Sequence, residues 1–235
     1  MRINKFLASA GLGSRRKCEE YVVQGKVKIN GEVITNLATD VSEKDVVTFD
    51  GKKIESPKEF TYLMMHKPKG YLTTVSDDRN RKTVMELLPS EFKTLMPVGR
   101  LDYNSEGLLL FTNNGDIAQK IMKPSREVVK TYSVKVEGEV SEDDKQAMEK
   151  GVTLVDGTTF KKCKVKIIEI KERKTKLEIQ ITEGKNREIR KIFEHFGYNV
   201  IFLKRISIGK IKLGGLTRGT CRLLRQSEIE YLKTL

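Results

Sequence analysis

The chain has 235 residues, 33% of them charged and 38% hydrophobic, and it carries a formal net charge of +13 at pH 7. This length exceeds one average domain and predicts two unequal ones, the larger with a sizeable hydrophobic core. No apolar run approaches the ~20 residues of a membrane span, and the first residues lack the apolar core of a secretory signal. We therefore expect a cytoplasmic protein that makes no membrane contact.

Cysteines and histidines are few and scattered. The three cysteines, Cys18, Cys163 and Cys221, are widely spaced and form no Cys-x-x-Cys pair, so neither a disulfide framework nor a zinc site is indicated. His66 and His195 are the only histidines, which leaves little material for imidazole chemistry. The sequence therefore predicts no metal site.

Positive charge is concentrated in two stretches. Between residues 184 and 225 eleven Lys or Arg residues stand against two Glu, and between residues 1 and 30 seven stand against two. A single basic stretch is usually a solvated surface. Two separate ones in a chain this basic favour a polyanion, and a nucleic acid in particular, as the partner.

The first residues predict two short helices. The first is stopped by Gly11, and Ser14 is a good N-cap for the second. Apolar residues occur at helical spacing in both, at Ile3, Phe6, Leu7 and Ala10 and then at Cys18, Tyr21 and Val22.

Three cations open the second helix: Arg15, Arg16 and Lys17. They oppose the helix dipole and do not stabilise the helix itself. Free N–H groups and positive side chains at a helix start together suit an anion, so we expect this helix start to hold phosphate.

Two hairpins follow, with turns at Asn30-Gly31 and Asp50-Gly51 and with Lys26 and Lys28 alternating with apolar residues. Two helices on short strands, with Ser-Arg-Arg-Lys at the second helix and Gly-Lys-Val-Lys-Ile-Asn-Gly after it, resemble an S4 RNA-binding domain over about residues 2–50. The resemblance implies binding to structured RNA through phosphates and shape. Residues 56–59 have the composition of a linker, so we expect an S4-like domain at 1–58 and a larger domain at 59–235.

The larger domain predicts helices mixed with alternating strands. Strands are expected at residues 60–65, 71–72, 108–111, 130–136, 164–170 and 177–181, and helices at 84–88, 115–122, 141–150 and 189–196. Lys67, in the turn at 66–70, is either a simple turn residue or a residue that contacts RNA, and we expect it to be among the residues that bind the substrate. This pattern is typical of an α+β fold with a mainly antiparallel sheet flanked by helices.

The stretch Val98-Gly99-Arg100-Leu101-Asp102 is the centre of the interpretation. Val98 and residues 108–111 predict two strands, so Asp102 lies on the irregular connection where a rigid scaffold can present a functional side chain. Asp102 is a candidate catalytic carboxylate. The alternative is that it caps a turn by bonding its own backbone.

A second candidate lies in the helix that follows Glu183. Its buried face is formed by Ile189, Ile192, Phe193 and Phe196. Arg187 and Lys191 point to solvent on this spacing, whereas Arg190 lies at the border of the apolar face and can reach a partly buried carboxylate or ligand. The alternative is a surface arginine whose stem covers its neighbours.

Familiar cofactor motifs are absent from the sequence. We find no Gly-x-x-x-x-Gly-Lys or Gly-x-Gly-x-x-Gly loop, no His-x-x-x-His pair and no nucleophile elbow. We therefore expect chemistry that uses carboxylate, aromatic and cationic groups and no cofactor.

Taken in chain order, the S4-like start, Gly-Arg-Leu-Asp, Ser-x-Gly-Leu-Leu-Leu, Lys-Thr-Tyr and Glu-Gly-Lys-Asn-Arg-Glu-Ile-Arg-Lys resemble the RsuA/RluB family of ribosomal RNA pseudouridine synthases. The resemblance covers nearly the whole chain. It implies an isomerase that breaks the bond from ribose to uracil N1 of a uridine, turns the uracil, and attaches C5 instead.

The resemblance also implies roles for individual residues. Asp102 is similar to the essential aspartate of the family, which attacks the ribose or the uracil or removes a ribose proton. Arg190 matches the basic partner of that aspartate. Tyr132 matches the aromatic residue on which the flipped uridine stacks. The alternative for Tyr132, which its residue type alone would favour, is an aromatic residue in the core of a strand. Ile189 would pack on the base from below, and Arg100 would fill the space that the base leaves. No role carries over to Arg187-Glu188, where a related branch has His-Gln.

Residues 108–112, 123–127 and 209–213 are more similar to the large-subunit, RluB-like members than to the small-subunit, RsuA-like ones. We therefore expect 23S rather than 16S ribosomal RNA as substrate, and a monomeric enzyme. The alternatives are the same reaction on 16S ribosomal RNA and a non-catalytic S4-domain factor for RNA binding or ribosome assembly. A glycoside or nucleoside hydrolase is disfavoured, because no second carboxylate is evidently paired with Asp102.

Overall fold

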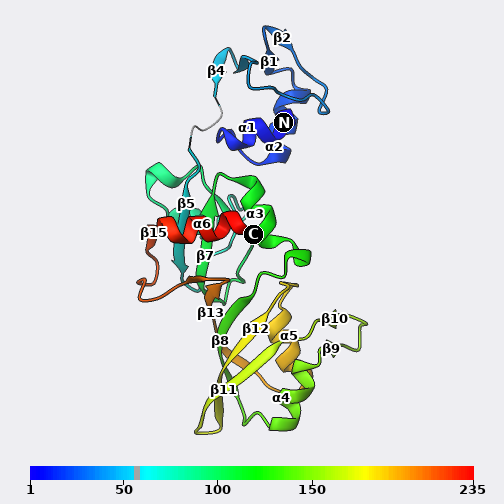
Figure 1. Ribbon diagram of the computed structural model, residues 1–235, viewed down its shortest axis with the longest axis vertical. Coiled ribbons are helices and arrows are strands. Elements are labelled where there is room, and N and C mark those ends of the chain that lie inside the picture. Colours follow the sequence, from blue (N-terminus) through cyan, green and yellow to red (C-terminus); the bar gives the residue numbers. More distant parts are fainter. Residues whose placement is uncertain (56–58) are drawn as a thin grey trace. The chain divides into compact units, whose positions relative to one another are not determined.

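The computed structural model of the chain describes residues 1–55 and 59–235 (Figure 1). These residues group into two compact units. The first holds Met1–Thr61, Ser90–Met96 and Thr112–Gly115, and the second holds Tyr62–Pro89, Pro97–Phe111 and Asp116–Leu235. The linker expected at 56–59 lies mostly outside the described residues, so the domain boundary at residue 58 stays a prediction.

The first unit begins with two helices on a small sheet. The helices α1 (Ile3–Ser9) and α2 (Arg15–Val23) precede β1 (Val27–Ile29), β2 (Glu32–Val33), β3 (Val47–Phe49) and β4 (Lys52–Ile54), in sheet order β2-β1-β3-β4. The Ser14 hydroxyl caps α2 by accepting from the backbone N–H of Lys17 at 3.2 Å. Asn30 and Asp50 take the left-handed conformation that the two predicted hairpin turns require.

The core of this unit joins the apolar faces of both helices to the strands. It consists of Ile3, Leu7, Cys18, Val22, Val27, Ile29, Val41 and Val47. Every helix residue of this core had been placed on an apolar face by its spacing in the sequence.

The second unit is built on a nine-stranded sheet with the order β11-β12-β8-β13-β7-β5-β15, to which β6 is added at β7 and β14 at β13. Its strands are β5 (Tyr62–Lys67), β6 (Met96–Val98), β7 (Glu106–Thr112), β8 (Lys130–Glu137), β11 (Lys164–Lys171), β12 (Lys174–Ile181), β13 (Val200–Ile208), β14 (Ile211–Lys212) and β15 (Cys221–Leu223). The pair β13–β7 is parallel, whereas β11–β12, β12–β8, β8–β13 and β5–β15 are antiparallel. The expectation of an α+β fold with a mainly antiparallel sheet is confirmed.

Helices and short turns complete the chain. The helices are α3 (Gly115–Met122), α4 (Glu142–Glu149), α5 (Glu188–His195) and α6 (Gln226–Thr234), and the 3-10 turns are η1 (Val84–Leu87), η2 (Ser90–Phe92) and η3 (Pro124–Arg126). A separate ribbon pairs β9 (Val152–Thr153) with β10 (Thr159–Phe160). Within the second unit, α4 and α5 lie beside β8, β11 and β12, whereas α3 and α6 lie beside β5 and β7 (Figure 1).

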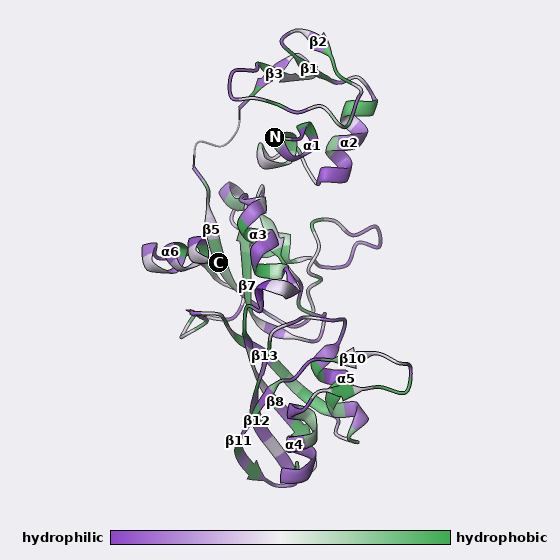
Figure 2. Ribbon diagram, turned by 45° about the vertical axis from the view of Figure 1, so that its right-hand side comes forward, coloured by the Kyte–Doolittle hydropathy of each residue, from purple (hydrophilic) through white to green (hydrophobic). Residues whose placement is uncertain are grey.

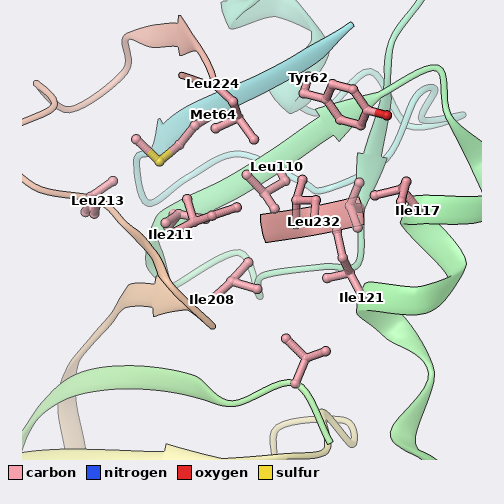
Figure 3. Packing of buried hydrophobic residues seen from close by; sticks show 13 residues of the cluster. Tyr62, Met64, Leu110, Ile117, Ile121, Ile208, Ile211, Leu213, Leu224 and Leu232 are labelled. Carbon is pink, nitrogen blue, oxygen red and sulfur yellow. The ribbon is translucent and has the colours of Figure 1, made fainter. Parts of the chain in front are cut away.

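A hydrophobic core holds α3 and α6 on the β5–β7 part of the sheet. Met64 from β5 and Leu110 from β7 meet Ile117 and Ile121 from α3 and Leu232 from α6 (Figure 3). Every position of β5 and β7 is buried, and the apolar run of β7 is coloured as hydrophobic in Figure 2. The core therefore makes these strands a rigid base for the connection between β6 and β7.

Strand β5 extends further than the sequence predicted. The turn was expected at residues 66–70, but β5 continues through His66 and Lys67, and both side chains are buried. The His66 imidazole lies 2.7 Å, through Nδ1, from the carbonyl of Leu216. Polar residues are poor signals for a buried strand, because their burial depends on partners that are distant in the sequence.

Strand β13 was not predicted at all. Its pairing with β8 shifts register twice, between Val200 and Phe202 and between Arg205 and Ser207. Each irregularity interrupts the alternation of apolar and polar residues, which removes the period-two signal from the sequence.

A glycine allows β7 and β13 to approach each other. Gly107 lies opposite Arg205 in the parallel pair and has a φ of +114°. A Cβ at Gly107 would lie 2.6 Å from the backbone nitrogen of Arg205, so no larger residue fits without a shift of the strands.

Candidate active site

A cleft of about 570 Å³ opens in the second unit, where the β6–β7 connection faces β8, β13 and the start of α5. Its volume is in the range of sites for small molecules or single nucleotides. The polar or functional residues on its wall include Arg100, Asp102, Lys130, Tyr132, Ile189 and Arg205. The fold therefore brings together four residues that the sequence had selected separately: Arg100, Asp102, Tyr132 and Ile189.

Asp102 lies in the turn between β6 and β7. Its backbone carbonyl accepts from the backbone N–H of Ser105 at 3.0 Å, which closes the turn. Its half-buried carboxylate accepts no hydrogen bond from any residue that the structure describes. The side chain is thus not used as a turn cap, and its oxygens are open to a ligand in the cleft.

A buried ammonium group holds this turn. Lys67, at the end of β5, is 0% exposed, and its Nζ donates to the carbonyls of Pro68 at 3.0 Å, Asp102 at 3.1 Å and Ser105 at 2.9 Å. All three hydrogens of the ammonium are therefore used. The expectation that Lys67 contacts the substrate is wrong, because the side chain is enclosed and does not line the cleft.

The charge of Lys67 also acts on the site. Burial lowers its pKa to about 8, while the carboxylates of Asp102 and Glu106 oppose that shift. At neutral pH the group remains mostly an ammonium, so it places a positive charge beside the turn that carries Asp102.

Tyr132 and Ile189 form apolar walls of the cleft. Tyr132, on β8, lies between Ile179 of β12 and Arg205 of β13 in the sheet, and its hydroxyl accepts from Arg205 Nη1 at 3.4 Å. Ile189 is buried in the first turn of α5. An aromatic ring and an aliphatic side chain on the wall of one cleft suit the two faces of a flat heterocycle.

Arg190 does not form the ion pair that the resemblance implied. Its Nη1 donates to the carbonyl of Val200 at 2.9 Å and its Nη2 to the carbonyl of Asn104 at 3.2 Å. Burial lowers its pKa, and the negative charge of Asp102 opposes this shift. In this structure Arg190 therefore supports the turn that carries Asp102 and acts on the carboxylate only through its charge.

Arg205 is a site residue that the sequence analysis missed. It is 4% exposed, lines the cleft, and donates from Nε to the carbonyl of Leu108 at 2.8 Å. The one signal in the sequence was its membership of the second basic stretch, which does not separate it from ten other cations. Its importance follows from the position of β13, which no periodicity indicated.

The loop before α5 is tied down by two buried carboxyl groups. Glu188 accepts from the backbone N–H of Lys185 at 2.8 Å, and Glu183 accepts from the backbone N–H of Lys161 at 2.7 Å. Burial, together with the neighbouring Glu183, raises the pKa of Glu188 to about 7. Arg187 is exposed, as its spacing predicted, but it precedes α5 in the left-handed conformation and also lines the cleft.

The cations expected to bind RNA in the first unit are exposed. They are Arg15, Arg16, Lys17, Lys26 and Lys28. Lys17 also forms an ion pair with Glu20 at 2.8 Å, which offsets part of the charge at the start of α2.

Two kinds of feature are absent from the part of the chain that the structure describes. No cluster of three or more His, Cys, Asp or Glu residues able to hold a metal ion occurs within residues 1–55 and 59–235. None of the helices in these ranges is long and apolar enough to cross a membrane.

Comparison with known proteins gives two family matches. A model described as RNA pseudouridylate synthase matches residues 61–195, and one described as S4 domain matches residues 1–47. The chain is 39% identical over 236 residues to the ribosomal large subunit pseudouridine synthase B of Bacillus subtilis (strain 168), covering 100% of this chain and 96% of that protein.

Two further relatives agree with these matches. A protein of Aquifex aeolicus (strain VF5), named an uncharacterized RNA pseudouridine synthase, is 42% identical over 234 residues, covering 99% of this chain and 93% of that protein. A crystal structure of a pseudouridylate synthase is 29% identical, with a TM-score of 0.73, and 99% of each chain is covered.

The buried ammonium yields a prediction about stability. Replacing Lys67 by Met leaves three carbonyls without their donor, and we expect the free energy of unfolding to fall by about 2–4 kcal/mol. Lys69→Met, two residues away and exposed, is the matched control and should change it by less than about 0.5 kcal/mol. Urea denaturation measures both; equal stabilities of the two variants would contradict the anchoring role.

The raised pKa of Glu188 yields a prediction about pH. Between the unfolded value of about 4.3 and the folded value of about 7, the native state holds a proton that the unfolded chain has released. The free energy of unfolding should therefore fall as pH rises through this window, by on the order of 2 kcal/mol.

Glu188→Gln keeps an acceptor for the Lys185 N–H and removes this pH dependence. Denaturation series at pH 4.5, 6 and 8 measure the effect, with the exposed Glu230→Gln as control. If Glu188→Gln retains the full slope of the unmodified protein, the buried carboxyl is not its source.

Proposed function

The chain belongs to the RNA pseudouridylate synthase family, as its motifs predicted, and on that premise we propose that it converts one uridine of 23S ribosomal RNA to pseudouridine with Asp102 as the catalytic carboxylate. The observation that carries this proposal is the carboxylate of Asp102, which has no hydrogen-bond partner among the described residues and lies on the same cleft as Tyr132 and Ile189.

The reaction balances without a co-reactant. The bond between ribose C1′ and uracil N1 breaks, a new bond joins C1′ to C5, and the proton that C5 loses is matched by one gained at N1. Asp102 either bonds covalently to the sugar or the base during this exchange or removes a ribose proton. In each case Lys67 and Arg190 supply positive charge near the reacting carboxylate.

The target uridine must leave its helix to reach the carboxylate. Extruding a base costs a few kcal/mol, which stacking on an aromatic ring partly recovers. We assign the stacking face to Tyr132 and the opposite contact to Ile189, because both line the cleft beside Asp102. We assign to Arg100, which is exposed and lines the same cleft, the filling of the space that the base leaves in the RNA helix.

The S4 domain supplies affinity in this proposal. Its exposed cations at the start of α2 and on β1 would contact phosphates of structured RNA, since A-form helices offer phosphates and shape to a protein more readily than base edges. Such contacts hold the RNA without selecting the target base.

The choice of 23S ribosomal RNA rests on the Bacillus subtilis relative, whose name assigns it to the large ribosomal subunit. The proposal includes a monomer that acts in the cytoplasm and needs no metal. The same reaction on 16S ribosomal RNA is the second candidate, and the experiment below separates the two.

A single substitution tests the catalytic role. Asp102→Asn keeps the size of the side chain and removes its charge, so we expect loss of pseudouridine formation by at least about a thousandfold with RNA affinity unchanged. The exposed Asp78→Asn is the matched control and should retain activity. The target is identified by mapping pseudouridine in 23S and 16S ribosomal RNA. Four strains are compared, which carry the wild-type gene, the Asp102→Asn variant, the Asp78→Asn variant, or no copy of the gene.

One 23S site should disappear without the gene and return only with the wild type and Asp78→Asn. A site lost from 16S instead would identify the second candidate. Full restoration by Asp102→Asn would remove Asp102 from the mechanism, and unchanged maps in all strains would contradict the proposed function.

The phosphate role of α2 is tested by its salt dependence. Changing Arg15, Arg16 and Lys17 together to Ala should weaken RNA binding and reduce the slope of log affinity against log salt by up to about three. The reduction falls below three to the extent that Glu20 already neutralises Lys17.

A triple variant on β11, with the exposed Lys164, Lys166 and Lys171 changed to Ala, removes the same charge elsewhere and is the control. It should leave the slope closer to that of the wild type. Equal slopes for the two triple variants would show that the start of α2 holds no phosphate.

A further inference from the structure

Arg205 is fixed in position from both sides. On β13 it lies opposite Tyr132 of β8 and opposite Gly107 of β7. Its Nε donates to the Leu108 carbonyl at 2.8 Å, and its Nη1 reaches the Tyr132 hydroxyl at 3.4 Å. The guanidinium carbon lies 5.9 Å from the centre of the Tyr132 ring. A planar cation is thus held rigidly beside the aromatic wall of the cleft.

One nitrogen of this guanidinium is unused. Nη2 is buried and has no hydrogen-bond partner within the described part of the chain. Leaving a buried charged donor unsatisfied costs free energy, so such groups need an explanation when they occur in a native protein. Through Nε and Nη1, Arg205 connects β7 to β8, which is a structural role for these two nitrogens. That role does not explain why Nη2 is buried without a partner.

A second buried cation shares this surface. Lys130 precedes Tyr132 by two residues on β8, so both side chains lie on the same face of the sheet, and Lys130 also lines the cleft. Within the part of the chain that the structure describes, its Nζ donates one long hydrogen bond, of 3.4 Å, to the Thr182 carbonyl. Burial and the charge of Arg205 both lower the pKa of Lys130. The wall around Tyr132 therefore carries two close positive charges before any substrate enters.

The reaction creates a matching negative charge on the base. When the bond from C1′ to N1 breaks, its electron pair stays on the uracil and spreads over N1 and the two carbonyl oxygens. An attack on the uracil ring likewise places negative charge on a carbonyl oxygen. Either way the charge disappears again when C5 bonds to C1′, loses its proton, and N1 is protonated.

We propose that Arg205 donates through Nη2 to a carbonyl oxygen of the uracil and stabilises the negative charge that the base carries between the breaking of one glycosidic bond and the formation of the other. This inference rests on the proposed function. Fixed donors aimed at developing charge in a water-poor site stabilise a transition state without reorganising, and removing one typically costs about 100–1000-fold in rate. Lys130 reinforces the positive potential on the same wall.

The test compares two leaving groups. Arg205→Gln removes the charge, and Lys204→Gln, the neighbour that faces the other side of the sheet, is the matched control. Single-turnover rates are measured on two RNA fragments, one with the target uridine and one with 5-fluorouridine in its place. For the second fragment, the rate is that at which 5-fluorouridine disappears from nucleoside digests of the RNA. Fluorine withdraws electrons, so 5-fluorouracil carries the negative charge more easily and needs less help from the protein.

We expect Arg205→Gln to slow the uridine reaction by about 100-fold or more, with RNA affinity unchanged, and to slow the 5-fluorouridine reaction at least about tenfold less. Lys204→Gln should match the wild type on both. Equal defects of Arg205→Gln on the two substrates, or no defect on either, would overturn the inference. A wild-type protein that is inactive on every ribosomal RNA tested would instead refute the proposed function.

A second measurement needs no variant and covers the case in which Arg205→Gln does not fold. At pH 7 5-nitrouracil is an anion, whereas uracil is neutral. As inhibitors of the wild-type enzyme, the anion should bind about tenfold or more tightly than uracil, because hydrogen bonds to charged groups are the stronger ones. Equal inhibition by the two bases would contradict an anion-stabilising wall.

Discussion

The site depends on the burial of one ammonium group. Lys67 has no exposed surface, and its three hydrogen bonds join the end of β5 to the turn that presents Asp102. Water cannot replace these bonds, so the turn and the strand are fixed relative to each other. The carboxylate of Asp102 therefore has a defined place on the cleft although none of the described residues donates a hydrogen bond to it. Arg190 adds to this support through the carbonyl of Asn104.

The second support of the site is β13, which joins the two parts of the sheet. It pairs in parallel with β7, where the chain has just left the Asp102 turn, and antiparallel with β8, which carries Tyr132. The close approach at Gly107 leaves no room for a side chain between β7 and β13. Arg205 thus lies between the strand that follows the carboxylate and the strand that carries the aromatic ring. A cation in this place lies close to the position where the proposed reaction puts negative charge on the base.

The sequence predicted the features that depend on local patterns and motifs, and it failed where partners are distant. The apolar spacing of α1 and α2 and the two hairpin turns were correct, because neighbouring residues decide them. The prediction for Lys67 was wrong, because its three carbonyl partners are revealed only when β5 and the β6–β7 connection are brought together. Arg205 was missed because two irregularities in β13 remove the alternation by which a strand is recognised. The pair of Arg190 with Asp102 was implied by the family resemblance, whereas in this structure the guanidinium donates to the carbonyls of Val200 and Asn104.

The central claim is that a uridine leaves its RNA helix and enters the cleft between Tyr132 and Ile189 beside the carboxylate of Asp102. The most direct test is a crystal structure of the Asp102→Asn protein bound to an RNA fragment that contains the target uridine. The account predicts the uracil stacked on the Tyr132 ring, with its ribose C1′ within about 4 Å of the side chain at position 102. A uridine that stays stacked in its helix, or that is bound outside this cleft, would contradict it.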